Sequence, residues 1–206
     1  MENGSKIKTI CVYGAGSNTL DQSYYDAAFE LGRLAAKRGK AIVYGGGNTG
    51  VMGYLAEGAS SEGGKVIGVA PEFMKPRGVL YGKCSEIIYT KDMRERKKVM
   101  DDLSDAFIVM PGGFGTLEEY FEVLTEKTLG LHTKPIALVN TNNIWDSLES
   151  LAVFFEDQGF ITEACHRAYK VCATPEDALD FIDNDPGMDR EAKWLKYVAT
   201  EEDALG

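Results

Sequence analysis

The stretch of this sequence best suited to chemistry is PGGFGTLEE, at 111–119. It follows an apolar run at 106–110 whose length and β-branched residues predict a buried strand, and it leads into a helical pattern. A strand, a glycine-rich turn and a helix start leave several backbone N–H groups without partners, and the helix dipole adds positive potential there. Such a turn favours a phosphate, with Glu119 close to whatever that phosphate carries.

A second interpretation of the same residues is structural. Thr116 and Glu119 have the spacing of a capping box, in which the Glu119 side chain would bond back to the Thr116 amide. The stretch would then only start a helix on which Leu117, Phe121 and Leu124 share one face. The choice between the two depends on the rest of the chain.

Composition limits the classes of function. The 206 residues are 44% hydrophobic and 26% charged, as expected for one α/β domain with a large core. We expect this single domain at 1–183, followed by an acidic tail at 184–206 that is loosely packed or disordered. The net charge of −10 argues against a nucleic-acid partner, which would need clustered lysine and arginine.

The four cysteines lack a CxxC spacing, and with only two histidines they argue against a structural zinc site. The chain shows neither a signal-peptide pattern nor a run of about 18 apolar residues. We therefore expect a cytoplasmic protein that binds no metal and no membrane.

Apolar runs alternate with helical patterns along the chain. This order predicts a doubly wound, mostly parallel α/β sheet of about seven strands, Rossmann-like, with helices on both faces. An irregular loop is expected at 71–85. The strands are expected at 7–13, 41–44, 65–70, 86–90, 106–110, 135–140 and 169–173 and the helices at 24–38, 51–61, 92–104, from the 111–119 turn to 129, 144–157, 162–168 and 175–182.

Glycine clusters follow the first, second and fifth predicted strands, at 14–16, 45–47 and 112–115. Parallel sheets bind ligands beyond the carboxyl ends of their strands, so all three turns should meet at one edge. A nicotinamide dinucleotide fits poorly, because the first turn has only two of the three fingerprint glycines and the second strand ends in Tyr44 rather than an acid. A Walker lysine is absent as well.

The helix expected at 92–104 carries an arginine on its apolar side. Arg96 falls about 20° from Leu103 on a helical projection, whereas Arg94 falls on the solvated face. A buried arginine needs an anionic partner. That partner is either a core acid in a structural ion pair or, because this end of the helix lies at the glycine edge, a ligand phosphate or catalytic carboxylate.

Taken together, PGGxGTxxE at 111–119, Arg96-Lys97 and YGGGxxGxMG at 44–53 resemble the Lonely Guy (LOG) family. Its members are cytokinin riboside 5'-monophosphate phosphoribohydrolases, often mislabelled lysine decarboxylases. The resemblance runs from about Ile10 to about Ile182. It implies a Rossmann-like homodimer that hydrolyses a nucleoside 5'-monophosphate to free base and ribose 5-phosphate, with no metal or cofactor.

Arg96 and Glu119 match the catalytic pair of that family. Its nucleotide contacts match Lys97, the turn at 113–119 and Thr125. With the glycine turns added, the expected substrate-binding residues are Gly16, Ser17, Gly45, Gly46, Gly47, Lys97, Gly112, Gly113, Phe114, Gly115, Thr116, Leu117, Glu118 and Thr125.

This assignment suits the chemistry. Cleavage of an N-glycosidic bond passes through an oxocarbenium-like sugar, whose positive charge a nearby carboxylate stabilises. Glu119 can play this role, or it can orient the ribose hydroxyls and the attacking water. We expect Arg96 to hold Glu119 ionised by lowering its pKa, or to stabilise charge on the departing base. Glu126 is expected on a solvated face. Three aromatic residues could stack on the base or could instead be part of the hydrophobic core: Tyr13, Phe73 and Tyr81.

The chain departs from the family pattern at three places. Arg94 stands where members commonly have histidine, Gly78 stands where many have glutamate, and 126–128 replaces a tryptophan-containing segment. All three concern the base, so AMP is a candidate substrate beside a prenylated nucleotide.

Two other functions use the same glycine edge. One is a carrier resembling molybdenum cofactor carrier proteins, which hold a phosphorylated pterin without turnover; only the Arg96–Glu119 pair separates it from the hydrolase. The other is a pyridoxal phosphate decarboxylase, which needs a lysine aldimine, and no lysine here has a recognisable setting for one.

Overall fold

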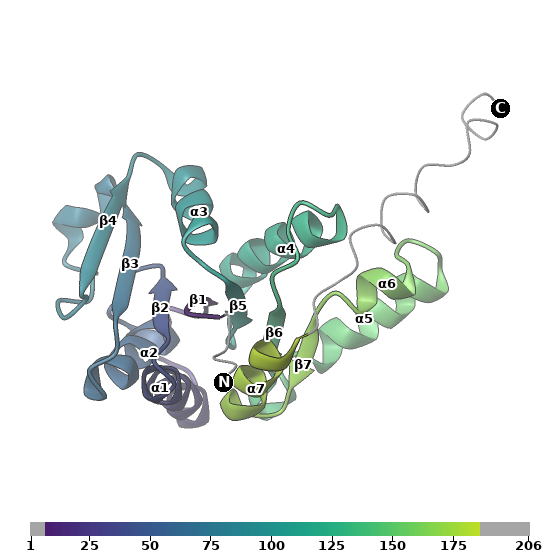
Figure 1. The fold of residues 1–206 in the computed structure, drawn as a ribbon, viewed down its shortest axis with the longest axis horizontal. Helices are drawn as coiled ribbons and strands as arrows, with labels where there is room; N and C mark the ends of the chain where they lie inside the picture. Colours follow the sequence, from purple (N-terminus) through teal and green to yellow (C-terminus); the bar gives the residue numbers. More distant parts are fainter. Residues whose placement is uncertain (1–6, 186–206) are drawn as a thin grey trace, which may run out of the picture.

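The computed structural model describes residues 7–185. Seven strands, all parallel to their neighbours, form one sheet in the order β4-β3-β2-β1-β5-β6-β7. This confirms the doubly wound α/β fold (Figure 1). The strands are β1 (Thr9–Tyr13), β2 (Ala41–Tyr44), β3 (Val66–Pro71), β4 (Glu86–Thr90), β5 (Ala106–Val109), β6 (Ile136–Val139) and β7 (Lys170–Cys172).

Helices cover both faces of the sheet. Figure 1 shows α1, α2 and α7 on one side, and α3 and α4 on the other. Two short 3-10 helices, η1 (Glu72–Arg77) and η2 (Thr141–Asn143), lie in loops, so the region expected as an irregular loop is partly helical. The α-helices are α1 (Gln22–Lys37), α2 (Gly50–Ser61), α3 (Met93–Asp102), α4 (Phe114–Thr128), α5 (Asp146–Asp157), α6 (Glu163–His166) and α7 (Pro175–Asn184).

Each face of the sheet has its own hydrophobic core, because side chains of successive strand residues point to opposite faces. On the first face, Ile10 and Val12 of β1 pack with α1, α2 and α7. On the second, Cys11 and Tyr13 pack with Met100 of α3 and with α4. The sheet is therefore buried on both sides and holds its carboxyl edge rigidly.

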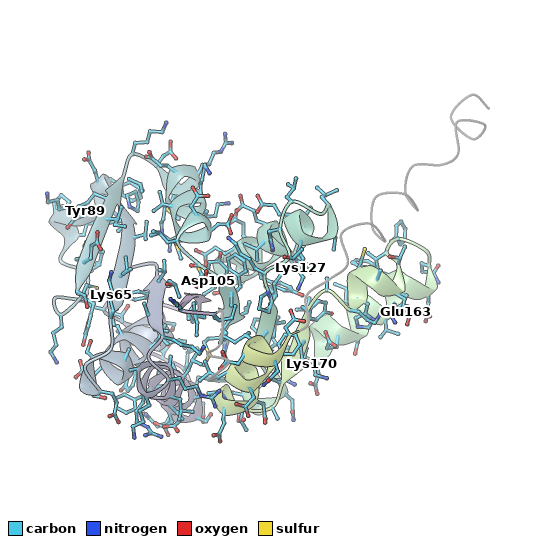
Figure 2. All side chains as sticks on the ribbon, in the orientation of Figure 1. Lys65, Tyr89, Asp105, Lys127, Glu163 and Lys170 are labelled. Carbon is cyan, nitrogen blue, oxygen red and sulfur yellow. The ribbon has the colours of Figure 1, made fainter. Side chains whose placement is uncertain are left out.

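The direction of winding reverses between β1 and β5, which are adjacent in the sheet. The turns that follow them are joined, since the Ala15 amide donates to the Pro111 carbonyl at 3.1 Å. At the other end of β5, the Asp105 carboxylate (Figure 2) accepts the amides of Lys8 and Thr9, both at 2.9 Å. Sheets of this kind bind ligands at such a reversal, and the three glycine turns follow strand ends at this edge as predicted.

Helix α4 begins two residues before Thr116, with Gly113 as its N-cap. The capping-box interpretation of Thr116 and Glu119 is therefore wrong, because Thr116 is already inside the helix. The helix is also rotated relative to the predicted face: Tyr120 and Val123 are buried, whereas Phe121 is 43% exposed. Apolar residues lie on more than one side of α4, and the side with Tyr120 and Val123 is the one that packs against the sheet.

Helix α7 begins as predicted, with Thr174 as N-cap in a complete capping box and Pro175 at the first position. Near its other end, Asp183 pairs with the buried Lys40 at 2.5 Å. The acidic tail was expected from residue 184, but Asn184 still belongs to α7. Residues 186–206 are outside the described part of the chain. Within 7–185, the helices are too short or too polar to cross a membrane.

Candidate active site

Arg96 lies in the first turn of α3. The carboxylate of the N-cap Asp92 accepts two amides of that turn, which fixes where the helix begins. Arg96 faces inward and is 7% exposed. Its Nε donates to the Val69 carbonyl at 3.1 Å and its Nη1 donates to Oε1 of Glu119 at 2.8 Å. The predicted buried arginine with an anionic partner is confirmed, and the partner is the carboxylate of the 111–119 motif.

Glu119 is nearly enclosed, with 12% of its side chain exposed. Burial raises the pKa of Glu119, and the adjacent Arg96 lowers it by a smaller amount, so the pKa lies above its ordinary value. Arg96 lowers this pKa as expected, but burial of the carboxylate outweighs the charge of its neighbour. The guanidinium limits this rise.

The start of α4 is open. Its N-cap, Gly113, has no side chain with which to cap the first-turn amides. Phe114 is 92% exposed, whereas Thr116 is 4% exposed. A Cβ on Gly112 would stand 2.1 Å from Thr116 Oγ1, so a side chain at 112 would push this turn out of place. The amides of the first turn are thus presented at the carboxyl edge of the sheet, as an anion site requires.

Lys97 extends from α3 toward α4, where it pairs with Glu118 and, at 2.5 Å, with Glu122. Partial burial lowers the pKa of Lys97, but the hydrogen bonds to the two carboxylates and their charges together raise it by more. The pKa of Lys97 therefore lies above its ordinary value. Lys97 therefore carries its positive charge beside the pair of Arg96 and Glu119. Its contact with a nucleotide stays a prediction.

The turns after β1 and β2 are tied together. Thr49 Oγ1 donates to the Gly16 carbonyl at 2.8 Å, and the Gly50 amide donates to Oδ1 of Asn18 at 2.8 Å. The predicted binding residues of both turns thus lie at the same sheet edge as the start of α4. Thr125 is different, because it lines an apolar cavity between α4 and α5. That position is not brought together with Arg96 and Glu119.

Three further expectations have mixed outcomes. Tyr81 is 8% exposed and belongs to the core. Tyr13 is 3% exposed but lines a cavity that Lys97 also lines. Phe73, in η1, is 52% exposed. Glu126 is half-buried rather than solvated, and burial raises its pKa.

Sequence reasoning missed two contributors to the site. The Val69 carbonyl could not be found from residue types, because every residue has one. Met52 was visible in the YGGGxxGxMG motif but had no assigned role; its side chain lies against Gly16, Gly45 and Gly47. Among the described residues, no group of three potential metal ligands lies together.

The fold and this site define a class: a doubly wound α/β protein with an open, glycine-capped helix start and an arginine–carboxylate pair at the strand ends. The family model described as "possible lysine decarboxylase" matches residues 52–182. The chain is similar to a cytokinin riboside 5'-monophosphate phosphoribohydrolase of Oryza sativa subsp. japonica, with 41% identity over 81% of this chain and 69% of the relative. A second such enzyme, from Arabidopsis thaliana, is 43% identical over 79% and 76% of the two chains. The protein therefore belongs to the family of cytokinin riboside 5'-monophosphate phosphoribohydrolases.

Solved structures with the same fold include molybdenum cofactor proteins. The molybdenum cofactor binding protein of Rippkaea orientalis superposes with a TM-score of 0.67 at 26% identity, over 85% of this chain and 94% of that chain. The molybdenum cofactor carrier protein of Chlamydomonas reinhardtii gives a TM-score of 0.65 at 25% identity, over 84% and 93%.

Proposed function

We propose that this protein hydrolyses the N-glycosidic bond of a nucleoside 5'-monophosphate, either a cytokinin riboside 5'-monophosphate or AMP, to free base and ribose 5-phosphate. The relatives named above support the reaction and the substrate class. The observation that carries the proposal for this chain is the 2.8 Å pair of Arg96 and Glu119, one turn beyond the open amides of α4.

In the proposed mechanism the substrate phosphate binds the amides at 113–116, which fixes the sugar without taking part in the reaction. The bond from C1′ of the ribose to the base nitrogen breaks, and its electron pair leaves with the base. The ionised Glu119 stabilises the positive charge that develops on the sugar. Water then adds to C1′, and its proton is available to the departing base. Arg96 holds Glu119 in place and limits the rise of its pKa.

The test is release of free base from a panel of nucleoside monophosphates, with and without EDTA. We expect release from AMP or a prenylated adenosine monophosphate, unchanged by the chelator. Glu119→Gln should lower kcat by at least about 100-fold, since a neutral amide cannot stabilise the charged sugar. Glu30→Gln, which neutralises a partly exposed glutamate of α1 outside the site, is the control and should stay within about twofold. Full activity of Glu119→Gln would remove that residue from the mechanism.

A second candidate function comes from the solved structures, two of which bind or carry the molybdenum cofactor. The same open amides could hold a phosphorylated pterin without turnover. Tight pterin binding, together with no base release from any nucleotide of the panel, would favour the carrier over the hydrolase.

We also propose that the protein is a cytoplasmic homodimer. All four cysteines are free thiols, which supports a reducing compartment. A surface formed by α4, α5 and α6 supports self-association, because it surrounds an apolar cavity of about 320 Å³ that Phe121, Leu151 and Phe155 line. These three side chains are between 36% and 43% exposed, and aromatic surface of this kind marks protein interfaces.

A further inference from the structure

The guanidinium of Arg96 is restrained on three sides, and only two of the restraints are hydrogen bonds. Nε is held by the Val69 carbonyl near the end of β3, and Nη1 is held by Glu119. The third side faces the main chain after β2. A Cβ built on Gly45 would stand 2.1 Å from Nη2 and 3.2 Å from Cζ of Arg96, far inside van der Waals contact.

The other two glycines of this turn do not share that neighbour. A Cβ on Gly46 would face Leu80 at 3.3 Å, and one on Gly47 would face the methyl carbon of Met52 at 2.8 Å. Of the three, Gly45 is the position where a side chain would occupy the place of the guanidinium. The side of Gly45 on which a side chain would stand is therefore already occupied by Arg96.

We propose that Gly45 is a positioning residue, whose bare Cα lets the Arg96 guanidinium reach Glu119 in the geometry needed for hydrolysis. This inference rests on the proposed function and refines it, because it assigns Gly45 to the placement of Arg96 rather than to substrate contact. A methyl group at 45 displaces the tip of a side chain and not backbone, so the chain can fold around it.

The test compares Gly45→Ala with Gly82→Ala. Gly82 is exposed and a Cβ there meets nothing within 4 Å, which makes it a matched control. We expect Gly45→Ala to lower kcat by about 10- to 100-fold with KM within about threefold, because the reacting groups move while the phosphate amides stay. Thermal unfolding of both variants checks that they fold. Equal kcat values in the two variants would overturn the proposal.

Two further measurements separate positioning from a general structural effect. Displacing Arg96 removes the charge that lowers the pKa of Glu119, so this pKa, followed by carbon NMR of its carboxyl group, should rise in Gly45→Ala. That measurement needs no turnover, so it decides the inference even if base release is absent and the proposed function fails. The Arg96→Lys variant lacks Nη2, so adding Gly45→Ala to it should lower kcat by less than about twofold relative to Arg96→Lys alone. An unchanged pKa, or the same fold loss in both backgrounds, would show that Gly45 does not act through Arg96.

Discussion

Nη1 of Arg96 and Oε1 of Glu119 lie 2.8 Å apart, although the two residues are 23 positions apart in the chain and belong to different helices. Their side chains are 9% and 12% exposed. Removing two charges from water is costly, and a well-packed apolar pair often stabilises a fold as well. A buried pair at the ligand edge of the sheet is therefore better explained by chemistry than by stability.

The pair predicts the acid side of the pH profile. The proposed reaction needs ionised Glu119, so kcat/KM should fall as the pH drops through the pKa of this carboxyl. Burial raises that pKa more than Arg96 lowers it, so the fall should be centred above 4.5, the ordinary glutamate value. A profile of kcat/KM against pH with AMP checks this. A limb at or below pH 4.5 would contradict the assignment of Glu119.

The open start of α4 predicts dependence on the 5'-phosphate. Adenosine lacks the group that the amides at 113–116 would bind, so its kcat/KM should be at least about 100-fold below that of AMP. Ribose 5-phosphate should inhibit competitively. Comparable rates for the nucleoside and the nucleotide would mean that the anion site does not position the sugar.

The apolar surface of α4 and α5 predicts an effect on assembly. Phe121→Asp places a charge on this surface, and we expect it to convert a dimer to a monomer in sedimentation velocity experiments. Leu103→Glu also replaces an exposed apolar residue, but outside the α4–α5 cavity, and should leave assembly unchanged. A dimer that persists in Phe121→Asp would place the interface elsewhere.

The last prediction concerns stability. Asp183 pairs with Lys40, whose side chain is 3% exposed, so Asp183→Ala leaves a buried cation without this partner. We expect a loss of about 3 kcal/mol in the free energy of unfolding, measured by urea denaturation. Asp180, on the same helix, pairs with Arg38 but is 61% exposed. Asp180→Ala should lower the free energy of unfolding by less than about 1 kcal/mol. Equal losses in the two variants would show that burial does not make the Lys40–Asp183 pair more important for stability.

Much of the architecture could be predicted because local signals and tertiary packing agree. Short β-branched runs alternating with helical patterns specify a parallel sheet, and a parallel sheet must bring its carboxyl-end turns to one edge. Helix α4 shows where agreement ends. Gly113, Phe114 and Thr116 are all plausible around a helix start, and apolar residues on two sides of the helix leave its rotation undetermined. The choice of Tyr120 over Phe121 was made by the shape of the sheet beneath it.

The sequence by itself determined the sheet, the glycine edge, the inward side of Arg96 and the motif that contains Glu119, because each follows from residue type and spacing along one element. Only the tertiary structure decided what those residues meet. The bond from Arg96 to the Val69 carbonyl, the contact with Gly45 and the raised pKa of Glu119 depend on distances and burial between elements far apart in the chain. No periodicity records such distances, since they are set by how the strand ends and the two helices pack together.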